Sequence, residues 1–520
     1  TLTLDDCAHV TLRGLRSALP VLQNATVLRL RRCAGLSSEL PWLDDSAVRV
    51  LARRCLALRR VSLAHCRRLT DYGVSAFADV AVSSLTHLDL SRLPRVTDTC
   101  LLALLLRCTK LQWLDASQLS AVEGLTLQGL PRNSAPALAT LHVAHDTRMH
   151  FLTLAHLVRT LHYGALTDVD VSHCAQLTDE TLVALGRYAP ALATLRLAFC
   201  TQVTDAGVAR LVEFQPLAND QLADFLADDA ARPRCTQLTT LDLTGCHQIT
   251  SDGLVAVARQ CHALETLMVD GLRRLDARGL HALATHCSRL AVLHWGGILI
   301  QSGPGSDAGF FSVPSVDRAA AQALRACRSL HTLAVGATAC DVAALADVLL
   351  PVLGPQLRDL DASGIATDAV LRSVAAHCTQ LRTLRLSRSR YFSHAAFLAV
   401  ATHCRQLRTL ELESCEQLRD EALVTLARHG GASLQTLVVS NDWQLTDTGI
   451  TALAQRCPRL RRLAVRHCPE VSPLCLRGIA ASVNSFVIAT RDGLEPKPAA
   501  ITAFLTLENE LEAAARRLTR

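Results

Sequence analysis

The sequence predicts an α/β solenoid, in which short parallel strands alternate with helices. One phrase recurs along the chain, and its clearest copy is LTTLDLTGCHQITSDGLVAVARQC at residues 238–261; Leu264 opens the next copy 26 residues after Leu238. Leucines alternate at the start of each copy, as in a short strand, and apolar residues then follow helical spacing, as Leu254 and Val257 do. A fixed period of this length indicates stacked repeats that bury their apolar faces on one another.

The phrase can be followed through nearly the whole chain. Its opening, L-x-x-L-x-L-x-x-C, is the spacing of a leucine-rich repeat. About eighteen strands are expected, mostly 26 or 27 residues apart, from Leu2 in the first strand to Ile488 in a last, degenerate one. The predicted architecture is a leucine-rich-repeat solenoid, a curved horseshoe with parallel strands on its concave face and helices on its convex face. Because Leu2 is already in strand register, the chain is expected to begin inside a repeat.

An I/L/V-T-D triplet follows most strands and predicts the start of each helix. Thr178, Thr204 and Thr446, each followed by an aspartate, are expected to cap or oppose the first free amides of their own helices.

The repeats are expected to fill residues 1–494, with three insertions. Residues 34–45 carry Trp42, which we expect to be exposed. Residues 214–234 contain an amphipathic segment with Leu222, Phe225 and Leu226 on one helical face, and residues 299–320 form a Gly/Ser/Pro loop around Phe310 and Phe311. Residues 495–520 predict a helix that either caps the last repeat or binds a partner.

Twenty cysteines would suggest zinc or disulfides if position were ignored. Eight stand at the end of a strand and nine stand three residues before a strand leucine, so they follow the repeat rather than a metal site. We expect buried thiols that act as small apolar groups and weak donors to the turn backbone. So many free thiols favour a reducing compartment, and we expect the protein to be intracellular and cytoplasmic.

Composition and motifs exclude several classes of function. No apolar run approaches the length of a membrane span, and Lys110 and Lys497 are the only lysines, so neither membrane nor nucleic-acid binding is expected. The sequence lacks phosphate-binding, dinucleotide-binding, nucleophile-elbow and zinc-protease motifs. We therefore predict a protein that is not an enzyme and holds no cofactor or metal.

The concave face is the main candidate binding surface, and its residues lie between the strand leucines. The middle position carries Asp89, Asp115, His142 and Asp170 in the first half of the chain, which should be mildly acidic. Later strands should be rich in arginine and mixed in charge, with these candidate contact residues: Arg385, Arg388, Glu411, Arg462 and Arg466. Arginine at such positions can hold carboxylates or phosphates, although ordinary solvated strand surface would look the same.

The repeat resembles the cysteine-containing leucine-rich repeats of F-box/LRR proteins and their relatives. The copies that carry this resemblance include ALTDVDVSHCAQLTDETLVALG and LRTLELESCEQLRDEALVTLA. In that family the repeats recognise substrates, and an N-terminal F-box recruits the adaptor of a ubiquitin ligase. No F-box is visible in this chain; other proteins with similar repeats are subunits of ciliary, axonemal assemblies.

We therefore expect a non-enzymatic scaffold that binds other proteins through its concave face and inserted loops, in one version as a subunit of a ciliary or flagellar complex. The alternative is the substrate-recognition subunit of an SCF-type ubiquitin ligase whose F-box is missing from this chain. In the first case the partners would be cytoskeletal or axonemal subunits, and in the second a cullin-ligase adaptor.

Overall fold

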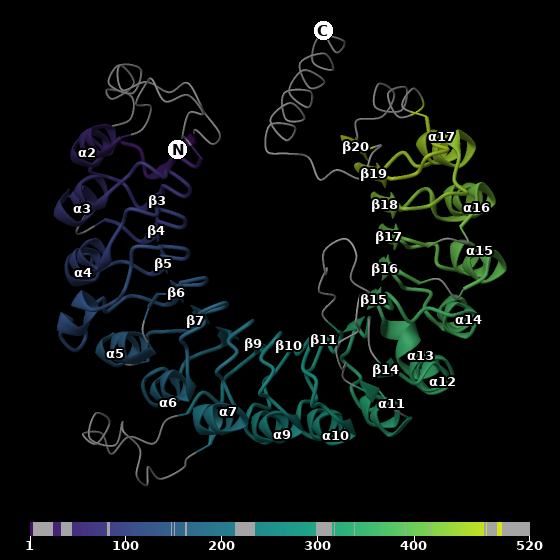
Figure 1. Ribbon diagram of the computed structural model, residues 1–520, viewed down its shortest axis with the longest axis horizontal. Helices are drawn as coiled ribbons and strands as arrows, with labels where there is room; N and C mark the ends of the chain where they lie inside the picture. Colours follow the sequence, from purple (N-terminus) through teal and green to yellow (C-terminus); the bar gives the residue numbers. More distant parts are fainter. Residues whose placement is uncertain are drawn as a thin grey trace, which may run out of the picture. The chain divides into compact units, whose positions relative to one another are not determined.

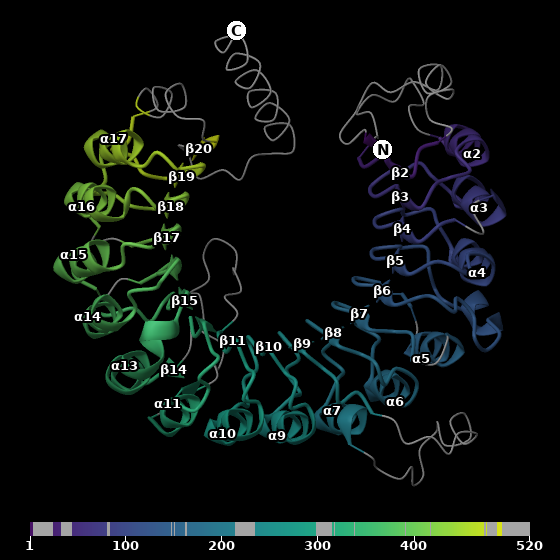
Figure 2. The same ribbon diagram turned by 180° about the vertical axis from the view of Figure 1, so that it is seen from behind.

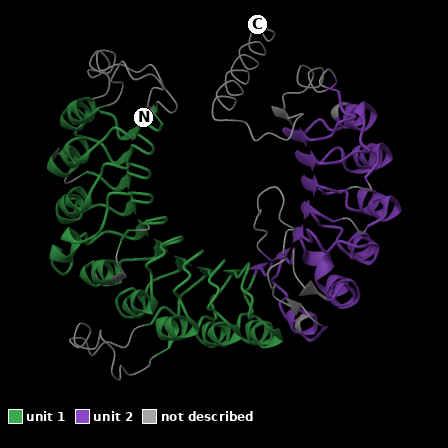
Figure 3. Ribbon diagram, viewed as in Figure 1, with its two compact units in different colours: residues 1–290 green, residues 291–520 purple. Residues whose placement is uncertain are grey.

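A computed structural model shows a solenoid of parallel strands and helices. It describes residues 1–3, 24–32, 44–80, 84–146, 148–149, 151–161, 164–213, 234–297, 315–316, 318–336, 339–389, 392–415, 418–472, 475 and 486–490. The chain divides into two compact units, residues 1–290 and 291–520 (Figure 3). In each unit the strands lie side by side, and the helices lie together on the opposite side of the repeats (Figures 1 and 2). The predicted leucine-rich-repeat fold is confirmed.

Among its described residues, the first unit contains ten parallel strands that pair in chain order. They are β1 (Leu2–Thr3), β2 (Val27–Arg29), β3 (Arg60–Ser62), β4 (His87–Asp89), β5 (Trp113–Asp115), β6 (Thr140–His142), β7 (Asp168–Asp170), β8 (Thr194–Arg196), β9 (Thr240–Asp242) and β10 (Thr266–Met268). Its helices are α2 (Asp45–Arg54), α3 (Asp71–Val80), α4 (Asp98–Arg107), the 3-10 turn η1 (Thr126–Gly129), α5 (Phe151–Thr160), α6 (Asp179–Tyr188), α7 (Asp205–Val212), α9 (Ser251–Gln260) and α10 (Ala277–His286).

The second unit repeats this plan, with eight strands of the same kind in the part that the structure describes. They are β11 (Val292–His294), β13 (Thr332–Ala334), β15 (Asp359–Asp361), β16 (Thr383–Arg385), β17 (Thr409–Glu413), β18 (Thr436–Ser440), β19 (Arg462–Arg466) and β20 (Phe486–Thr490). Its helices are α11 (Arg318–Leu324), α12 (Val342–Ala344), the π-helical η2 (Leu345–Leu349), α13 (Leu350–Leu353), the 3-10 turn η3 (Gly354–Gln356), α14 (Asp368–His377), α15 (His394–His403), α16 (Asp420–Gly430) and α17 (Asp447–Arg456).

A small second sheet in this unit has no counterpart in the repeat pattern. It pairs β12 (Ser315–Val316) with β14 (Ala339–Cys340) in parallel. The predicted insertion at 299–320 thus includes a short strand. Most of this insertion, most of the insertions at 34–45 and 214–234, and the predicted helix at 495–520 lie outside the described residues. The same holds for the predicted contact residues Trp42, Leu222, Phe225, Leu226, Phe310 and Phe311.

The buried core is built from the apolar positions of the repeated sequence. In β9, Leu241 and the following Leu243 are completely buried, whereas Thr240 and Asp242 on the other face are half-buried. In α9, Leu254 and Val257 are also completely buried and pack toward the strands. Burying a leucine side chain contributes about 1.5–3 kcal/mol, so the repeated leucines are the main source of stability. In the described part of the chain, no helix is long and apolar enough to cross a membrane.

Cysteines form two hydrogen-bonded series between repeats. Strand-end thiols donate to a carbonyl of the preceding repeat, as Cys246 does to Leu197 at 3.1 Å and Cys200 does to Val171 at 3.2 Å. Thiols after the helices do the same, as Cys261 does to the carbonyl of Cys235 at 3.5 Å. Burial raises the pKa of Cys246 to about 12, which keeps it a thiol that can donate. The described cysteines are buried or half-buried and free, as the sequence predicts.

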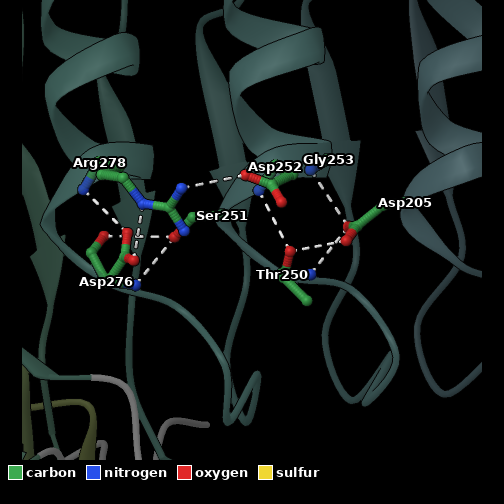
Figure 4. Close-up of polar contacts among 7 residues, drawn as sticks. All are labelled: Asp205, Thr250, Ser251, Asp252, Gly253, Asp276 and Arg278. Atoms are coloured by element: carbon green, nitrogen blue, oxygen red, sulfur yellow. Dashed lines mark hydrogen bonds and ion pairs between the residues drawn. The ribbon is translucent and has the colours of Figure 1, made fainter.

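Aspartates at the helix starts join neighbouring repeats rather than their own helix turn. Asp205 accepts the backbone N–H of Thr250 at 2.8 Å and its hydroxyl at 2.6 Å (Figure 4). The same two-point contact recurs in both units, in the pairs Asp45–Thr70, Asp71–Thr97, Asp179–Thr204, Asp368–Ser393, Asp420–Thr446 and Asp447–Ser472. We call this series the aspartate ladder.

The predicted role of the T-D pair is only partly that of a cap: Asp179, Asp205 and Asp447 lie in the first turn of their helices, where a carboxylate opposes the free amides, but their two-point hydrogen bonds go to the next repeat. Thr204 and Thr446 accept an N–H of their own helix, but Thr178 makes no side-chain cap. The carboxylate reaches the next repeat because that repeat offers both an N–H and a hydroxyl to one carboxylate. A two-point hydrogen bond to a charged acceptor is stronger than a single neutral one.

The ladder also explains the glycine at the third helical residue. A Cβ at Gly253 would overlap Oδ1 of Asp205, whose oxygen accepts the N–H of Gly253 at 3.1 Å. In the next repeat Ser251 stands where the aspartate would be, and its Oγ accepts from the N–H of Asp276 at 2.9 Å (Figure 4). There a Cβ at Gly279 would lie 3.3 Å from Ser251 Oγ, which is tight but not an overlap.

We predict that Gly253→Ala destabilises the protein by about 1–3 kcal/mol, because the new methyl group overlaps Asp205. Asp205→Ser should also destabilise it, but the double variant should cost less than the sum of the two, since serine leaves room for the methyl group. Urea denaturation measures all three. Gly129→Ala, where no atom lies within 4 Å of the new Cβ, is the matched control. Strictly additive free energies would contradict the steric explanation.

Candidate functional site

The exposed face of the first unit's strands carries a continuous row of polar and aromatic side chains. Rings of His87 and Trp113 stack with centroids 6.3 Å apart, and Trp113 meets His142 edge-on at 5.7 Å. Asp168, on the next strand, lies 3.6 Å from His142 Nε2 and 2.8 Å from Arg196. These five residues come from β4 to β8, and each is half-buried. We call them the concave cluster.

Electrostatics within the concave cluster favour a charged histidine. Burial opposes protonation of His142, but the carboxylate of Asp168, 3.6 Å from Nε2, together with the charges of Asp115 and Asp170, outweighs it and raises the pKa of His142. Burial also opposes the charged form of Asp168, yet His142 and Arg196 lower its pKa. The cluster is therefore an ion network on rigid strands.

The predicted aspartates of this face have a structural role as well. Asp115 and Asp170 each accept the N–H two residues ahead, from Ser117 at 2.9 Å and from Ser172 at 3.0 Å. Asp242 does the same with Thr244 at 2.9 Å, so an L/V-D-x-S/T phrase marks this turn. One carboxylate oxygen is used in this way, and the charge remains on the half-buried face.

Asp89 differs from the other predicted aspartates because it is 6% exposed. One oxygen accepts the hydroxyl of Ser62 at 2.6 Å and the guanidinium of Arg31 at 3.3 Å, and the other accepts the hydroxyl of Ser91 at 2.7 Å. Its acceptor sites are thus occupied by neighbouring repeats, and we infer that it positions Arg31 rather than contacting a ligand.

The predicted residues of the second unit are only partly brought together. Arg385 and Glu411 lie opposite each other on β16 and β17 and form an ion pair at 3.0 Å. Arg462 is exposed and Arg466 half-buried at the two ends of β19. Arg388 is exposed in the turn after β16, with a φ of 59°.

A column of left-handed residues, which sequence reasoning missed, follows the strands. In most of the described repeats the residue before the strand-end position has a positive φ, and many of these residues donate their N–H to the next repeat, as His173 does to Ala198. In the first unit these residues are Arg32, His65, Arg92, Gln118, His145, His173, Phe199, Gly245 and Gly271. His145 stacks on His173 at 4.0 Å, and His173 stacks on Phe199 at 4.6 Å.

A side chain in this conformation costs about 1–2 kcal/mol relative to glycine. Seven successive repeats nevertheless carry a planar side chain there. His65 and His173 stand in this column directly before the strand-end cysteines Cys66 and Cys174.

Two aspartates stand where other repeats have the strand-end cysteine, and both are buried. Asp146 is 2% exposed; one oxygen accepts the N–H of Leu119 at 2.8 Å, and the other has no hydrogen-bond partner in the structure. Burial, and then the charge of Asp115, raise its pKa to about 8. Burial likewise raises the pKa of Asp442 to about 6. Protonated, each carboxyl can donate as the cysteine does in other repeats.

The perturbed pKa values in this region do not define a catalytic centre. Asp146 is too deeply buried to reach a substrate, and its burial accounts for its pKa. His142 and Asp168 form an ion network with Arg196 rather than activating a hydroxyl or thiol nucleophile. Within the ranges that the structure describes, no three His, Cys, Asp or Glu side chains come together as metal ligands would. What the arrangement can do chemically is hold charged and aromatic side chains in fixed places.

Comparison with known proteins agrees with the repeat type. A family model described as Leucine Rich repeat matches residues 234–258. Among solved structures, the chain is similar to one in the complex of Rad7 and Elc1 from yeast, with a TM-score of 0.48 and 18% identity over 76% of this chain and 86% of that one. It is also similar to an internalin, InlF, from Listeria monocytogenes, with a TM-score of 0.40 and 14% identity over 93% and 95% of the two chains.

The class of the protein follows from its own repeats together with the family-model match. It is a leucine-rich-repeat solenoid of the cysteine-containing kind, as the sequence predicts.

We predict that Asp146→Cys changes the pH dependence of stability. The native carboxyl, with a pKa of about 8, keeps its proton where the unfolded one, with a pKa of about 3.9, has lost it. Native stability therefore falls as pH rises from about 4 to 8, by up to about 1.4 kcal/mol per pH unit, and levels off above. Cysteine should remove this slope.

Urea denaturation between pH 4.5 and 8.5 measures the slope for both proteins. The exposed carboxyl of Asp252, replaced by asparagine, is the control and should leave the slope unchanged. Equal slopes for the wild type and Asp146→Cys would show that Asp146 is ionised in the native protein.

Proposed function

We propose that this protein is a non-enzymatic scaffold that binds another protein through the exposed face of its strands. The observation that carries this proposal is the concave cluster: Trp113, two histidines and an Asp–Arg ion pair run without a break across five strands of the first unit. Each side chain is held by a rigid strand and by its neighbours, so little conformational entropy is lost on binding. Tryptophan and arginine are also the residues most enriched in binding hot spots.

The repeat plan supports the same conclusion. Stacked repeats give an extended surface in which alternate strand residues are free to vary while the leucines below them are not. Leu114 and Leu141 are almost completely buried, whereas Trp113 and His142 beside them are half-buried. The variable residues therefore change the surface without changing the core.

The proposal also covers the cellular setting of the scaffold and its additional contact residues. The repeat type supports two settings, a subunit of a large assembly such as a ciliary one, or the substrate receptor of a ubiquitin ligase. The predicted contact residues Trp42, Phe225 and Phe310–Phe311 would add to the strand surface in either setting; they lie outside the described residues and stay a prediction. Protein recovered with the chain distinguishes the settings: a cullin-ligase adaptor supports the receptor, and axonemal or cytoskeletal subunits support the assembly.

We predict that Trp113→Ala weakens capture of the native partner about tenfold or more, because a hot-spot truncation costs about 2 kcal/mol. The experiment compares tagged wild type, Trp113→Ala and the helix-side control Gln260→Ala by quantitative affinity purification from the native source. Thermal melting of each protein reports stability. Equal recovery with Trp113→Ala at unchanged melting temperature would contradict binding through this face.

A further inference from the structure

The first strands of the solenoid carry an excess of exposed arginines. Arg31 leaves the end of β2, Arg32 and Arg92 stand in the left-handed column, and Arg67 lies in the turn after β3; all four are exposed. His65 lies among them: burial, and then the charges of Arg92, Arg32 and Arg67, lower its pKa. We call these four arginines the basic end.

Backbone geometry brings the basic end together. Arg32 donates its N–H to Ala64, His65 donates to Ser91 and Arg92 donates to Ser117, so the column residues stand on successive rungs. The carboxylates that the structure describes nearby cancel only part of this charge: Asp89 pairs with Arg31 at 3.3 Å, and Asp71 accepts from Thr97 in the aspartate ladder.

An acidic row follows on the same face of the same unit. It consists of Asp115 on β5, Asp168 and Asp170 on β7, and Asp242 on β9. Arg196 pairs with Asp168, whereas Asp115, Asp170 and Asp242 lie half-buried on this face, and each accepts the backbone N–H two residues ahead.

The distances fit an extended chain. Neighbouring strands lie about 4.8 Å apart, so the basic end spans about 10 Å from β2 to β4, and the acidic row spans about 19 Å from β5 to β9. An extended polypeptide rises about 3.3 Å per residue, so about three residues would cover the first stretch and about six the second.

We propose that the strand face of the first unit binds an extended polypeptide segment whose charges are segregated, with acidic or phosphorylated residues on the basic end and lysines or arginines on the acidic row. This rests on the proposed scaffold function and names the class of partner. Arginine suits the acidic part because its planar fork binds carboxylate or phosphate with two hydrogen bonds. A nucleic acid is disfavoured, because its uniform negative charge would meet the acidic row directly after the basic end.

The test uses the full chain and two fluorescent peptides of identical composition. One has all its glutamates in one half and all its lysines in the other, and the second alternates them. Fluorescence anisotropy should give about tenfold tighter binding of the segregated peptide at low salt, and the difference should shrink as salt screens the charges. Equal affinity for the two peptides would overturn the proposal.

Two variants locate the binding. Arg67→Gln with Arg92→Gln removes two of the four charges of the basic end, and glutamine already stands in the left-handed column at Gln118. Asp170→Asn with Asp242→Asn removes two of the four charges of the acidic row and keeps the oxygen that accepts the turn N–H. Each double variant should lower the affinity for the segregated peptide several-fold and leave the affinity for the alternating peptide unchanged. Arg259→Gln, on the helix side, should leave both affinities unchanged. Melting temperatures check that each variant is folded.

Two further outcomes would also overturn the proposal. Weakening by Arg259→Gln to the same degree would indicate nonspecific attraction. Binding of an oligothymidylate at least as tightly as the segregated peptide, strengthened by Asp170→Asn with Asp242→Asn, would indicate a nucleic-acid surface. If neither peptide binds but Trp113→Ala still loses the native partner, the scaffold function stands. Only the charge-segregated partner is then rejected.

Discussion

The two-point hydrogen bond between an aspartate of one repeat and a threonine or serine of the next is the constraint on which the solenoid depends. Leucine burial holds each pair of repeats together, but it is not directional and fixes no register. The ladder fixes register at the helix starts, as Asp205 shows with Thr250, and cysteine thiols do the same at the strand ends and helix ends. Because these polar groups are satisfied only across a repeat boundary, a single repeat would leave them unpaired.

This constraint also decides which positions can vary. The leucines, the T-D pair and the third helical glycine are tied to a neighbour, as Gly253 is to Asp205. The contacts of the half-buried strand positions instead differ from one repeat to the next, as the Asp168–Arg196 ion pair differs from the stacking of His87 on Trp113, and the left-handed column holds glycine at Gly245 and an imidazole at His173. Chemical variety is therefore concentrated on the strand face, which is the face that we propose binds the partner.

Much of the fold could be predicted from the sequence because the repeat has a fixed period. The alternating leucines predict the strands, and the cysteine positions predict buried thiols. The partner of each helix-start aspartate could not be predicted from one repeat, since Asp179 meets Thr204 of the next. The left-handed column was missed for a similar reason, because histidine and arginine give no local signal of a positive φ.

The candidate site was predicted less completely than the fold. Asp115 and Asp170 were placed on the correct face, but their bonds to Ser117 and Ser172 make them part of the turn as well. Trp113 was not singled out, because its importance comes from its ring contacts with residues of other strands: it stacks on His87 and meets His142 edge-on. The arginines of the basic end were also missed, since they come from three different repeats.

Hydroxyl-radical footprinting of the chain with its native partner tests the central claim most directly, because it reports the solvent accessibility of individual side chains. If the partner binds through the strand face, Trp113 becomes protected in the complex. Tyr72, which is 62% exposed on α3, then stays as reactive as in the free protein. Protection of Tyr72 with an unchanged Trp113 would contradict binding through the strand face.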